Sequence, residues 1–266
     1  MTDTYPAVLV AADGSPGGRA AVAAATYVAA RLGVPLTIVT AWDGSVSATG
    51  TLDYQWAREI AEAAETTARA SGVADVTLEL PPGTPGDTLV EFTHEFSDHL
   101  LVIGSGGLDR ATDRLMGSVS NQVSHNSAAD VLFVEPARPA PWQTFGLATD
   151  GSGTSRIAVG RGAALAVACG GAVHLVTVAK DEAEGARLMT PALAELEHHQ
   201  PELPITRDVV TGLLQERAMA EVGNNYDMLI IGNRGMSGPA RLLGSTANKV
   251  THRVATNLLL VNTTRD

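Results

Sequence analysis

Two glycine-rich stretches carry the residue pattern with the clearest chemical meaning in this sequence. In the first, Gly104 and Gly107 are separated by two residues, and nine further residues precede Gly117-Ser118. Glycines let the backbone turn tightly and approach a ligand closely. A helix that begins at Gly117-Ser118 would direct free N–H groups at an anion. The pattern predicts a cradle for phosphate groups, with the hydroxyls of Ser118 and Ser120 as further donors.

The second stretch repeats this pattern with one residue fewer. Its order is Gly232-x2-Gly235-x8-Gly244-Ser245, and Thr246 follows. The hydroxyls of Ser245 and Thr246 match those of the first stretch. The shorter spacing would shift how this loop meets phosphate groups.

The charged residues of the two stretches differ. The first holds Asp109 and Asp113 interleaved with Arg110 and Arg114, whereas the second offers Arg234 and Arg241 without a carboxylate. Carboxylates beside phosphates repel them unless a cation intervenes. Asp109 and Asp113 therefore either point to solvent, or one of them reaches a Mg²⁺.

A second interpretation of the first stretch is a pyrophosphatase-type ATP loop, because residues 105–110 read SGGLDR. Such a loop should follow the first strand of its domain and end in a hydroxyl residue. Here it follows the fourth apolar segment and ends in Arg110. The corresponding residues 233–238, NRGMSG, carry Arg234 and Ser237 at positions where the first stretch has Gly and Asp. We interpret this likeness as accidental.

Apolar strand-like segments alternate with helical patterns around both stretches. Near-continuous apolar strands that alternate with helices indicate a doubly wound parallel sheet with helices on both faces. Ser15 is the expected N-cap of the first helix and Gly33 its stop. The expected strands and helices, in chain order, are 8–13, 14–33, 35–42, 52–72, 75–80, 84–97, 99–105, 118–127 and 130–136, then 145–150, 156–171, 172–179, 182–199, 206–212, 214–224, 227–233, 247–255 and 257–263.

The same order of strands and helices occurs twice in the sequence. AVLVAADGS (7–15) matches TFGLATDGS (144–152), and RLMGSVSNQVSHNSAADVLFVEP (114–136) matches RLLGSTANKVTHRVATNLLLVNT (241–263). The proline-rich EPARPAPWQ at 135–143 favours an extended linker between the copies. We expect two tandem five-stranded α/β domains, 1–140 and 141–266, related by a pseudo-two-fold axis.

Ligands of open parallel sheets bind beyond the carboxyl ends of the strands, where the strand order reverses. Asp13 and Asp150 end the first expected strand of each copy, and Ala41 and Val178 end the second. The glycine stretches begin where the fourth strand ends. These residues are therefore expected to converge on one crevice per domain.

With its two Asp-Gly-Ser triplets, its glycine loops and its closing VSH and VTH helices, the chain resembles a tandem universal stress protein over nearly its whole length. The resemblance implies ATP binding with Mg²⁺, with Asp13 and Asp150 on the ribose or adenine side and Ala41 and Val178 against the adenine. The glycines and hydroxyls would hold the phosphates. The residues expected to contact nucleotide are Ala12, Asp13, Gly14, Ala41, Gly104, Gly107, Gly117, Ser118, Val119, Ser120, Thr149, Asp150, Gly151, Val178, Gly232, Arg234, Gly235, Gly244, Ser245, Thr246 and Ala247.

Composition excludes several classes of partner. The net charge of −11, from 18 Lys+Arg against 29 Asp+Glu, disfavours nucleic acid. No segment approaches the roughly 20 apolar residues of a membrane span, so we expect a soluble cytoplasmic protein. Aromatics are only 4% of the residues, which predicts aliphatic cores. Cys169 lies in an apolar run and is expected to be buried, and His125 and His252 are expected to serve packing or the surface.

Three functions fit these observations. The first is a regulatory module that binds ATP and signals stress to an unidentified protein partner. The second is a slow ATPase or phosphodiester hydrolase, for which the sequence offers no clear water-positioning group. The third is a scaffold whose glycine loops are structural turns that bind nothing. We favour binding and assign no catalytic residue and no protein metal site. The closing strands VLFVEP and LLLVNT would otherwise expose sheet edges, and the resemblance implies that such strands pair across a two-fold axis. We therefore also expect an intramolecular pseudo-dimer and a dimer of tandem chains.

Overall fold

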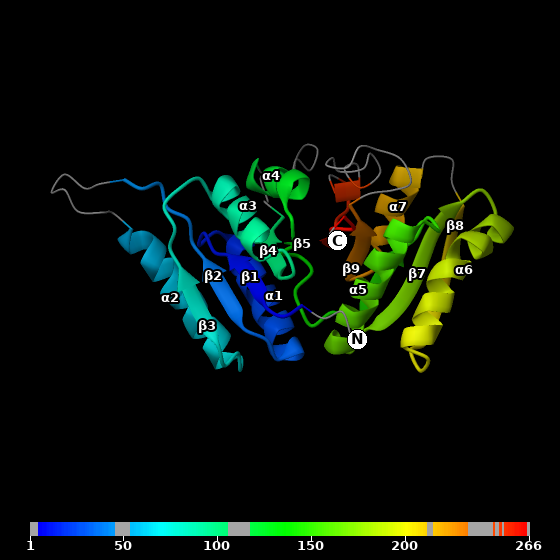
Figure 1. The fold of residues 1–266 in the computed structure, drawn as a ribbon, viewed down its shortest axis with the longest axis horizontal. Helices are drawn as coiled ribbons and strands as arrows, with labels where there is room; N and C mark the ends of the chain where they lie inside the picture. The colour runs from blue at the N-terminus through cyan, green and yellow to red at the C-terminus, as the bar shows by residue number, and fades with distance from the viewer. Residues whose placement is uncertain are drawn as a thin grey trace. The chain divides into compact units, whose positions relative to one another are not determined.

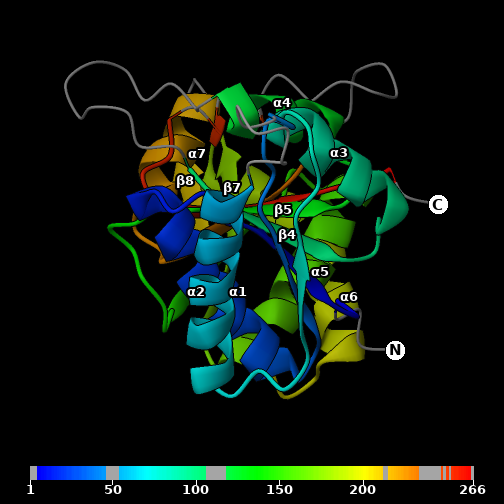
Figure 2. The same cartoon turned by 90° about the vertical axis from the view of Figure 1, so that its left-hand side faces the viewer.

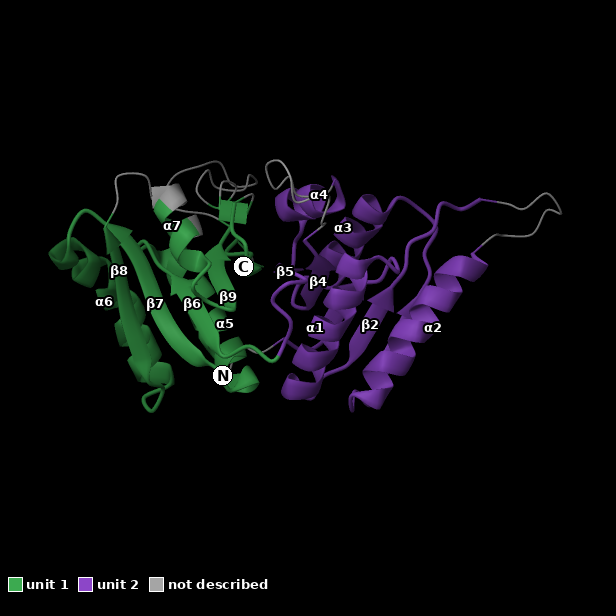
Figure 3. Cartoon of the chain, turned by 180° about the vertical axis from the view of Figure 1, so that it is seen from behind, with its two compact units in different colours: residues 1–4, 141–266 green, residues 5–140 purple. Residues whose placement is uncertain are grey.

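The computed structural model of the chain divides into two compact units, Tyr5–Ala140 and Pro141–Asp266 (Figures 1 and 3). No helix or strand occurs between residues 135 and 143, where the two units meet in the sequence. The structure describes residues 5–45, 54–105, 118–211, 215–233, 247, 250–251 and 253–264.

The N-terminal unit is a parallel five-stranded sheet with the strand order β3-β2-β1-β4-β5. The order reverses at β1, which pairs with β2 on one side and β4 on the other. Its elements are β1 (Val8–Ala11), α1 (Pro16–Leu32), β2 (Leu36–Val39), α2 (Gln55–Ala70), β3 (Val76–Glu79), α3 (Pro85–Glu95), β4 (Leu100–Gly104), α4 (Ser118–Asn126) and β5 (Asp130–Val134).

Helices cover both faces of this sheet. The chain moves from β1 to β3 in one direction and from β3 to β5 in the other, so right-handed crossovers place α1 and α2 on one face and α3 and α4 on the opposite one. Accordingly, α1 packs against α2 and α3 packs against α4 (Figure 2). The strands are therefore buried on both sides, and β4 reads as a continuous apolar run.

The C-terminal unit repeats this topology with the order β10-β9-β6-β7-β8, again with parallel pairs. Between β9 and β10, the described residues Ala247, Val250 and Thr251 are helical. Its elements are β6 (Thr144–Ala148), α5 (Gly153–Cys169), β7 (Ala172–Ala179), α6 (Glu182–His199), β8 (Ile205–Thr211), α7 (Gln215–Gly223), β9 (Met228–Gly232) and β10 (Asn257–Val261). The expected α/β class and two doubly wound sheets are confirmed.

Local signals placed several helix ends correctly. The Ser15 hydroxyl accepts a hydrogen bond from the Gly18 N–H at 2.9 Å, and α1 ends at Gly33 with φ +68°. In contrast, α5 begins three residues before the expected 156, because the Ser152 hydroxyl caps it by accepting from the Ser155 N–H at 3.1 Å. Both caps satisfy N–H groups that a helix start leaves without backbone partners.

The expectation that Asp13 and Asp150 end strands is wrong by two residues. β1 ends at Ala11 and β6 at Ala148. Each Asp side chain instead accepts a hydrogen bond from the backbone two residues on, which turns the chain into the following helix.

The cores are mainly aliphatic, as the composition predicted. The largest fully buried side chains include Leu9, Leu100 and Leu175, with Trp142 and Phe145 as the aromatic exceptions. Cys169 is buried, as expected. None of the helices in the described part of the chain is long and apolar enough to cross a membrane.

Candidate functional site

In the N-terminal unit, the described candidate residues lie beyond the carboxyl ends of three adjacent strands. The Ala12 N–H donates to the Val39 carbonyl at 2.9 Å, which continues the β1–β2 pairing past the end of β1. Ala41 follows β2 by two residues and is half-buried, and Gly104 is the last residue of β4. Ala12, Asp13, Ala41 and Gly104 therefore share one edge of the sheet, at the point where the strand order reverses.

The Asp13 carboxylate is held over the first turn of α1. Its Oδ1 accepts from the Ser15 N–H at 2.9 Å and from the Ser15 hydroxyl at 2.7 Å. Gly14 has φ +72°, a conformation that favours glycine. A Cβ on Gly18 would lie 2.0 Å from Asp13 Oδ1, so this glycine makes room for the carboxylate. Asp13 is exposed, and its Oδ2 has no partner in the described part of the chain.

Gly104 serves packing in this structure. A Cβ on Gly104 would lie 2.8 Å from both the carbonyl carbon and oxygen of Gly17. The glycine thus lets β4 approach the first turn of α1, an approach that requires no ligand. A sequence pattern cannot distinguish this role from close approach to a phosphate.

The hydroxyls at the start of α4 have different surroundings. The Ser120 hydroxyl donates to the Gly104 carbonyl at 3.1 Å, and Ser120 is 4% exposed. That hydroxyl therefore links α4 to β4. Ser118 is exposed at the first residue of α4, and Val119 is half-buried. The remaining candidates of this loop, Gly107 and Gly117, lie outside the described residues, as do Asp109 and Asp113.

A groove of about 600 Å³ opens between α1 and α2 beside Asp13. Ala12 and Gly14 border it, and the apolar side chains of Trp56 and Ile60 line its other wall. Trp56 is 45% exposed, which is unusual for a large apolar side chain. The sequence interpretation missed this wall, although the spacing of Trp56 and Ile60 by four residues put both on one helix face. The complete lining is Ala12, Gly14, Gly18, Arg19, Val22, Trp56, Glu59, Ile60, Ala63, Ala64 and Thr67.

Two charged groups near this edge are held by local hydrogen bonds. The Arg19 guanidinium donates to the Gly14 carbonyl. The Ser45 N–H donates to Asp43 Oδ1 at 3.0 Å, and this backbone bond, together with the Ser45 hydroxyl, lowers the pKa of the exposed Asp43 carboxyl. Asp43 thus remains ionised on the loop that follows Ala41.

The C-terminal unit builds the same turn after its first strand. Asp150 Oδ1 accepts from the Ser152 N–H at 2.9 Å, and Gly151 has φ +79°. Asp150 is exposed, like Asp13. The preceding Thr149 is buried, and its hydroxyl accepts from the Gly151 N–H at 3.1 Å and lies 3.0 Å from the Ser155 hydroxyl. Thr149 therefore stabilises the turn where the N-terminal unit has Ala12.

The other candidates of the C-terminal unit are only partly described. Val178 is buried within β7, and Gly232 ends β9 opposite Val261. Ala247 is buried in the helical segment before β10. Arg234, Gly235, Gly244, Ser245 and Thr246 lie outside the described residues, as does His252. His125 is half-buried on α4.

Potential metal ligands do not gather in the described parts of either unit. No group of three or more His, Cys, Asp or Glu side chains in those parts is arranged to hold a metal ion.

Comparison with known proteins finds one family whose model matches both units. A model described as "Universal stress protein family" matches residues 4–135 and 141–262. A Staphylococcus aureus protein named as a universal stress protein is 31% identical over 150 residues, covering 53% of this chain and 90% of its own length. A universal stress protein from Archaeoglobus fulgidus has a similar fold, with a TM-score of 0.73 at 19% identity, over 97% of this chain and 99% of its own. A Pseudomonas aeruginosa structure titled as a universal stress protein gives a TM-score of 0.70 at 14% identity, over 98% and 94%.

Proposed function

This chain belongs to the universal stress protein family, and we propose that it is a stress-response regulator that binds one adenine nucleotide, ATP, in each unit. Binding, with at most slow hydrolysis, would report the nucleotide level to a protein partner.

The observation that carries the proposal is the turn built twice at the reversal of strand order. Asp13 and Asp150 are both exposed, both followed by a glycine with positive φ, and both anchored through Oδ1 to a backbone N–H. In each, the anchored oxygen fixes the direction of the carboxylate and leaves Oδ2 for a ligand. A carboxylate at this edge of a doubly wound sheet is suited to accept hydrogen bonds from ribose hydroxyls. We therefore assign Asp13 and Asp150 to the nucleoside side.

The start of α4 suits the phosphate side. Ser118 begins a nine-residue helix and is exposed, so its N-terminal N–H groups and hydroxyl are compatible with an anion. Gly117 and Ser118 would hold the phosphates, and in the C-terminal unit Gly244 and Ser245 would do so. Mg²⁺, if bound with ATP, would neutralise phosphate charge, and Asp109 or Asp113 would supply its protein contact. The donor set of the described residues fits a nucleotide held mainly by backbone groups.

The groove between α1 and α2 supplies an apolar surface next to Asp13. Its walls include Val22, Trp56 and Ile60, and no lining residue other than Arg19 and Glu59 is charged. We propose that the nucleoside side of the ligand lies at the mouth of this groove, which Ala12 and Gly14 form.

The proposal is tested on the whole protein by calorimetry with ATP and by identification of nucleotide released from freshly purified, denatured protein. We expect Asp13→Ala and Asp150→Ala each to weaken one site about tenfold or more, since each removes a charged hydrogen-bond acceptor. Asp75→Ala is the matched control, because Asp75 is also exposed but lies before β3, at the opposite end of the sheet. Unchanged ATP binding in the Asp13→Ala/Asp150→Ala double variant would refute the assignment.

Assembly is part of the same proposal. We propose that tandem chains associate as dimers, as the family resemblance implies. Sedimentation of the purified protein at several concentrations tests this, and a single species with the mass of one chain, 27.5 kDa, would refute it.

A further inference from the structure

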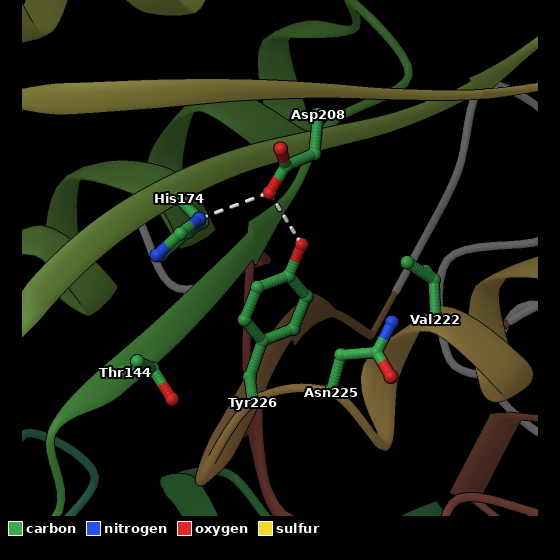
Figure 4. A pocket seen from close by; sticks show the side chains of 6 residues that line it. All are labelled: Thr144, His174, Asp208, Val222, Asn225 and Tyr226. Carbon is green, nitrogen blue, oxygen red and sulfur yellow. Dashed lines mark hydrogen bonds and ion pairs between the residues drawn. The ribbon is translucent and has the colours of Figure 1, made fainter.

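A second cluster of polar side chains lies in the C-terminal unit, at the end of its sheet away from Asp150. Asp208 of β8 accepts through Oδ2 a hydrogen bond from the Tyr226 hydroxyl at 2.6 Å, and His174 Nδ1 of β7 lies 2.9 Å from the same oxygen (Figure 4). The rings of His174 and Tyr226 are 5.1 Å apart between centroids. One carboxylate oxygen thus fixes two aromatic rings.

The cluster is built into the sheet. Tyr226 lies two residues before the start of β9 and is 5% exposed. A Cβ on Gly146, in the middle of β6, would lie 2.3 Å from the Tyr226 ring. Gly146 therefore leaves the space in which the tyrosine ring lies against the strand. A glycine inside a central strand costs stability, and here the ring explains it.

The fold itself does not require this cluster, because the N-terminal unit builds the same sheet without it. Strand register identifies the corresponding positions, since Val8 pairs with Leu36 as Phe145 pairs with Val173, and β2 pairs with β3 as β7 pairs with β8. The counterparts of Gly146, His174, Asp208 and Tyr226 are Leu9, Thr37, Glu79 and Asp98. At these four positions the N-terminal unit therefore has no aromatic ring and no glycine.

A cavity of about 370 Å³ opens beside the cluster, which is within the range of small-ligand sites. Two of its polar atoms, Asp208 Oδ1 and His174 Nε2, have no hydrogen-bond partner among the described residues, and the side chain of Asn225 also has none there. The cavity is lined by Thr144, His174, Asp208, Val222, Asn225 and Tyr226 (Figure 4). No lysine or arginine is among them.

The polar atoms of the cavity that lack partners among the described residues determine which chemical groups a ligand needs. When a neutral His174 imidazole donates a hydrogen bond from Nδ1 to Asp208 Oδ2, its Nε2 is left as an acceptor on the side of the ring away from Asp208. Asp208 Oδ1 is a second acceptor and carries negative charge, while the Tyr226 hydroxyl is already used as a donor to Oδ2. The face of the Tyr226 ring attracts cations through its quadrupole. A ligand therefore needs hydrogen-bond donors and positive charge on a small body.

We propose that this cavity is a second ligand site, specific to the C-terminal unit, which binds a small organic ammonium ion. The ammonium group donates to Asp208 Oδ1, the His174 and Tyr226 rings contact its carbon body, and the Asn225 amide lies at the rim. The site is separate from the proposed nucleotide site, which lies at the carboxyl ends of the strands.

The test uses benzylammonium as the probe, with benzyl alcohol and benzoate as neutral and anionic controls of the same shape. On the full-length protein, calorimetry is expected to give one benzylammonium site per chain and at least tenfold weaker binding of both controls. The imidazole NMR signals of His174, assigned with His174→Thr, are expected to shift with benzylammonium. ATP binding is measured in parallel and is expected to be unaffected, so failure here and failure of the nucleotide proposal give different results.

Two variants locate the site. Asp208→Asn keeps the shape but removes the charge, and it is expected to weaken benzylammonium about tenfold or more. Glu79→Gln is the matched control at the corresponding position of the N-terminal unit and should leave binding unchanged. His174→Thr introduces the residue found at the corresponding position of the N-terminal unit. It is expected to weaken benzylammonium binding as well, and it serves as the test variant if thermal unfolding shows that Asp208→Asn is unstable. Preference for benzoate, absence of both heat and imidazole shifts, or full affinity in folded Asp208→Asn or His174→Thr would overturn the proposal.

Discussion

Gly104 at the end of β4 lies against the backbone of Gly17 in the first turn of α1, so closely that a Cβ on Gly104 would come within 2.8 Å of the Gly17 carbonyl. The neighbouring atoms belong to backbone and cannot rotate away. Gly104→Ala is therefore expected to force β4 and α1 apart and to lower the free energy of unfolding by about 1–3 kcal/mol.

The control for this variant is Gly160→Ala. Gly160 lies inside α5, and nothing is within 4 Å of a Cβ built on it. Alanine is favoured over glycine in a helix by about 0.5–1 kcal/mol, so this variant should be neutral or stabilising. Chemical denaturation of both variants measures the difference. A Gly104→Ala protein as stable as the parent would show that the contact is not a packing constraint.

The nucleoside assignment predicts a difference between two ligands. Replacing Asp13 and Asp150 together by Ala should weaken ATP strongly and inorganic triphosphate little, because triphosphate lacks the ribose that these carboxylates are proposed to contact. Titration calorimetry with both ligands provides the comparison. Equal losses would place the two carboxylates at the phosphates or in the fold itself.

Local chemistry explains which parts of the molecule could be predicted. The Ser15 cap and the Gly33 stop of α1 involve residues within a few positions of each other, so their types alone indicate them. The doubly wound class followed from the alternation of strands and helices, and the two tandem units followed from the repeat. In contrast, the role of Gly104 depends on a contact with Gly17, far away in the sequence, and its residue type fits a ligand contact equally well.

The cluster at Asp208 shows the same limit more strongly. His174, Asp208 and Tyr226 lie on two strands and a loop, and only the register of β7 and β8 brings the first two together. Nothing in their spacing along the chain resembles a motif. The signal that could have indicated this cluster is the comparison of the two copies. At these positions the second copy departs from the first, and Gly146 interrupts an otherwise apolar central strand.

The phosphate assignment leads to a prediction at Gly117, which directly precedes α4 in the sequence. Gly117→Glu would add a bulky anion where the helix N-terminus is proposed to meet phosphate, and like charges repel. ATP binding at the site of the N-terminal unit should be lost while circular dichroism and thermal unfolding remain those of the parent. Gly117→Ala, which adds no charge, separates repulsion from size. Two unchanged ATP sites in folded Gly117→Glu would show that the glycine loop is not the cradle.

Tyr226 predicts how stability responds to alkaline pH. Burial of the phenol, followed by its hydrogen bond to Asp208, raises the pKa of Tyr226 well above its ordinary value of 10.0. Below pH 10.0 the phenol is protonated in both the folded and the unfolded chain, and its contribution to stability is complete. As the pH rises further, the unfolded chain loses this proton first, so the free energy of unfolding should fall by up to about 1.4 kcal/mol per pH unit until the folded protein also ionises.

Denaturant unfolding at a series of alkaline pH values measures this slope, and Tyr226→Phe should make it shallower. Phenolate absorbance provides a second measurement, because the sequence has only four tyrosines. The phenolate absorbance of the parent minus that of Tyr226→Phe reports Tyr226 alone. This difference in absorbance should increase only above the pH at which an exposed tyrosine ionises. Asp208→Asn removes the charged acceptor and should move that difference toward lower pH. If the difference instead rises near pH 10.0 in the parent protein, the phenol is not held in the protonated form, and the hydrogen bond to Asp208 does not persist in solution.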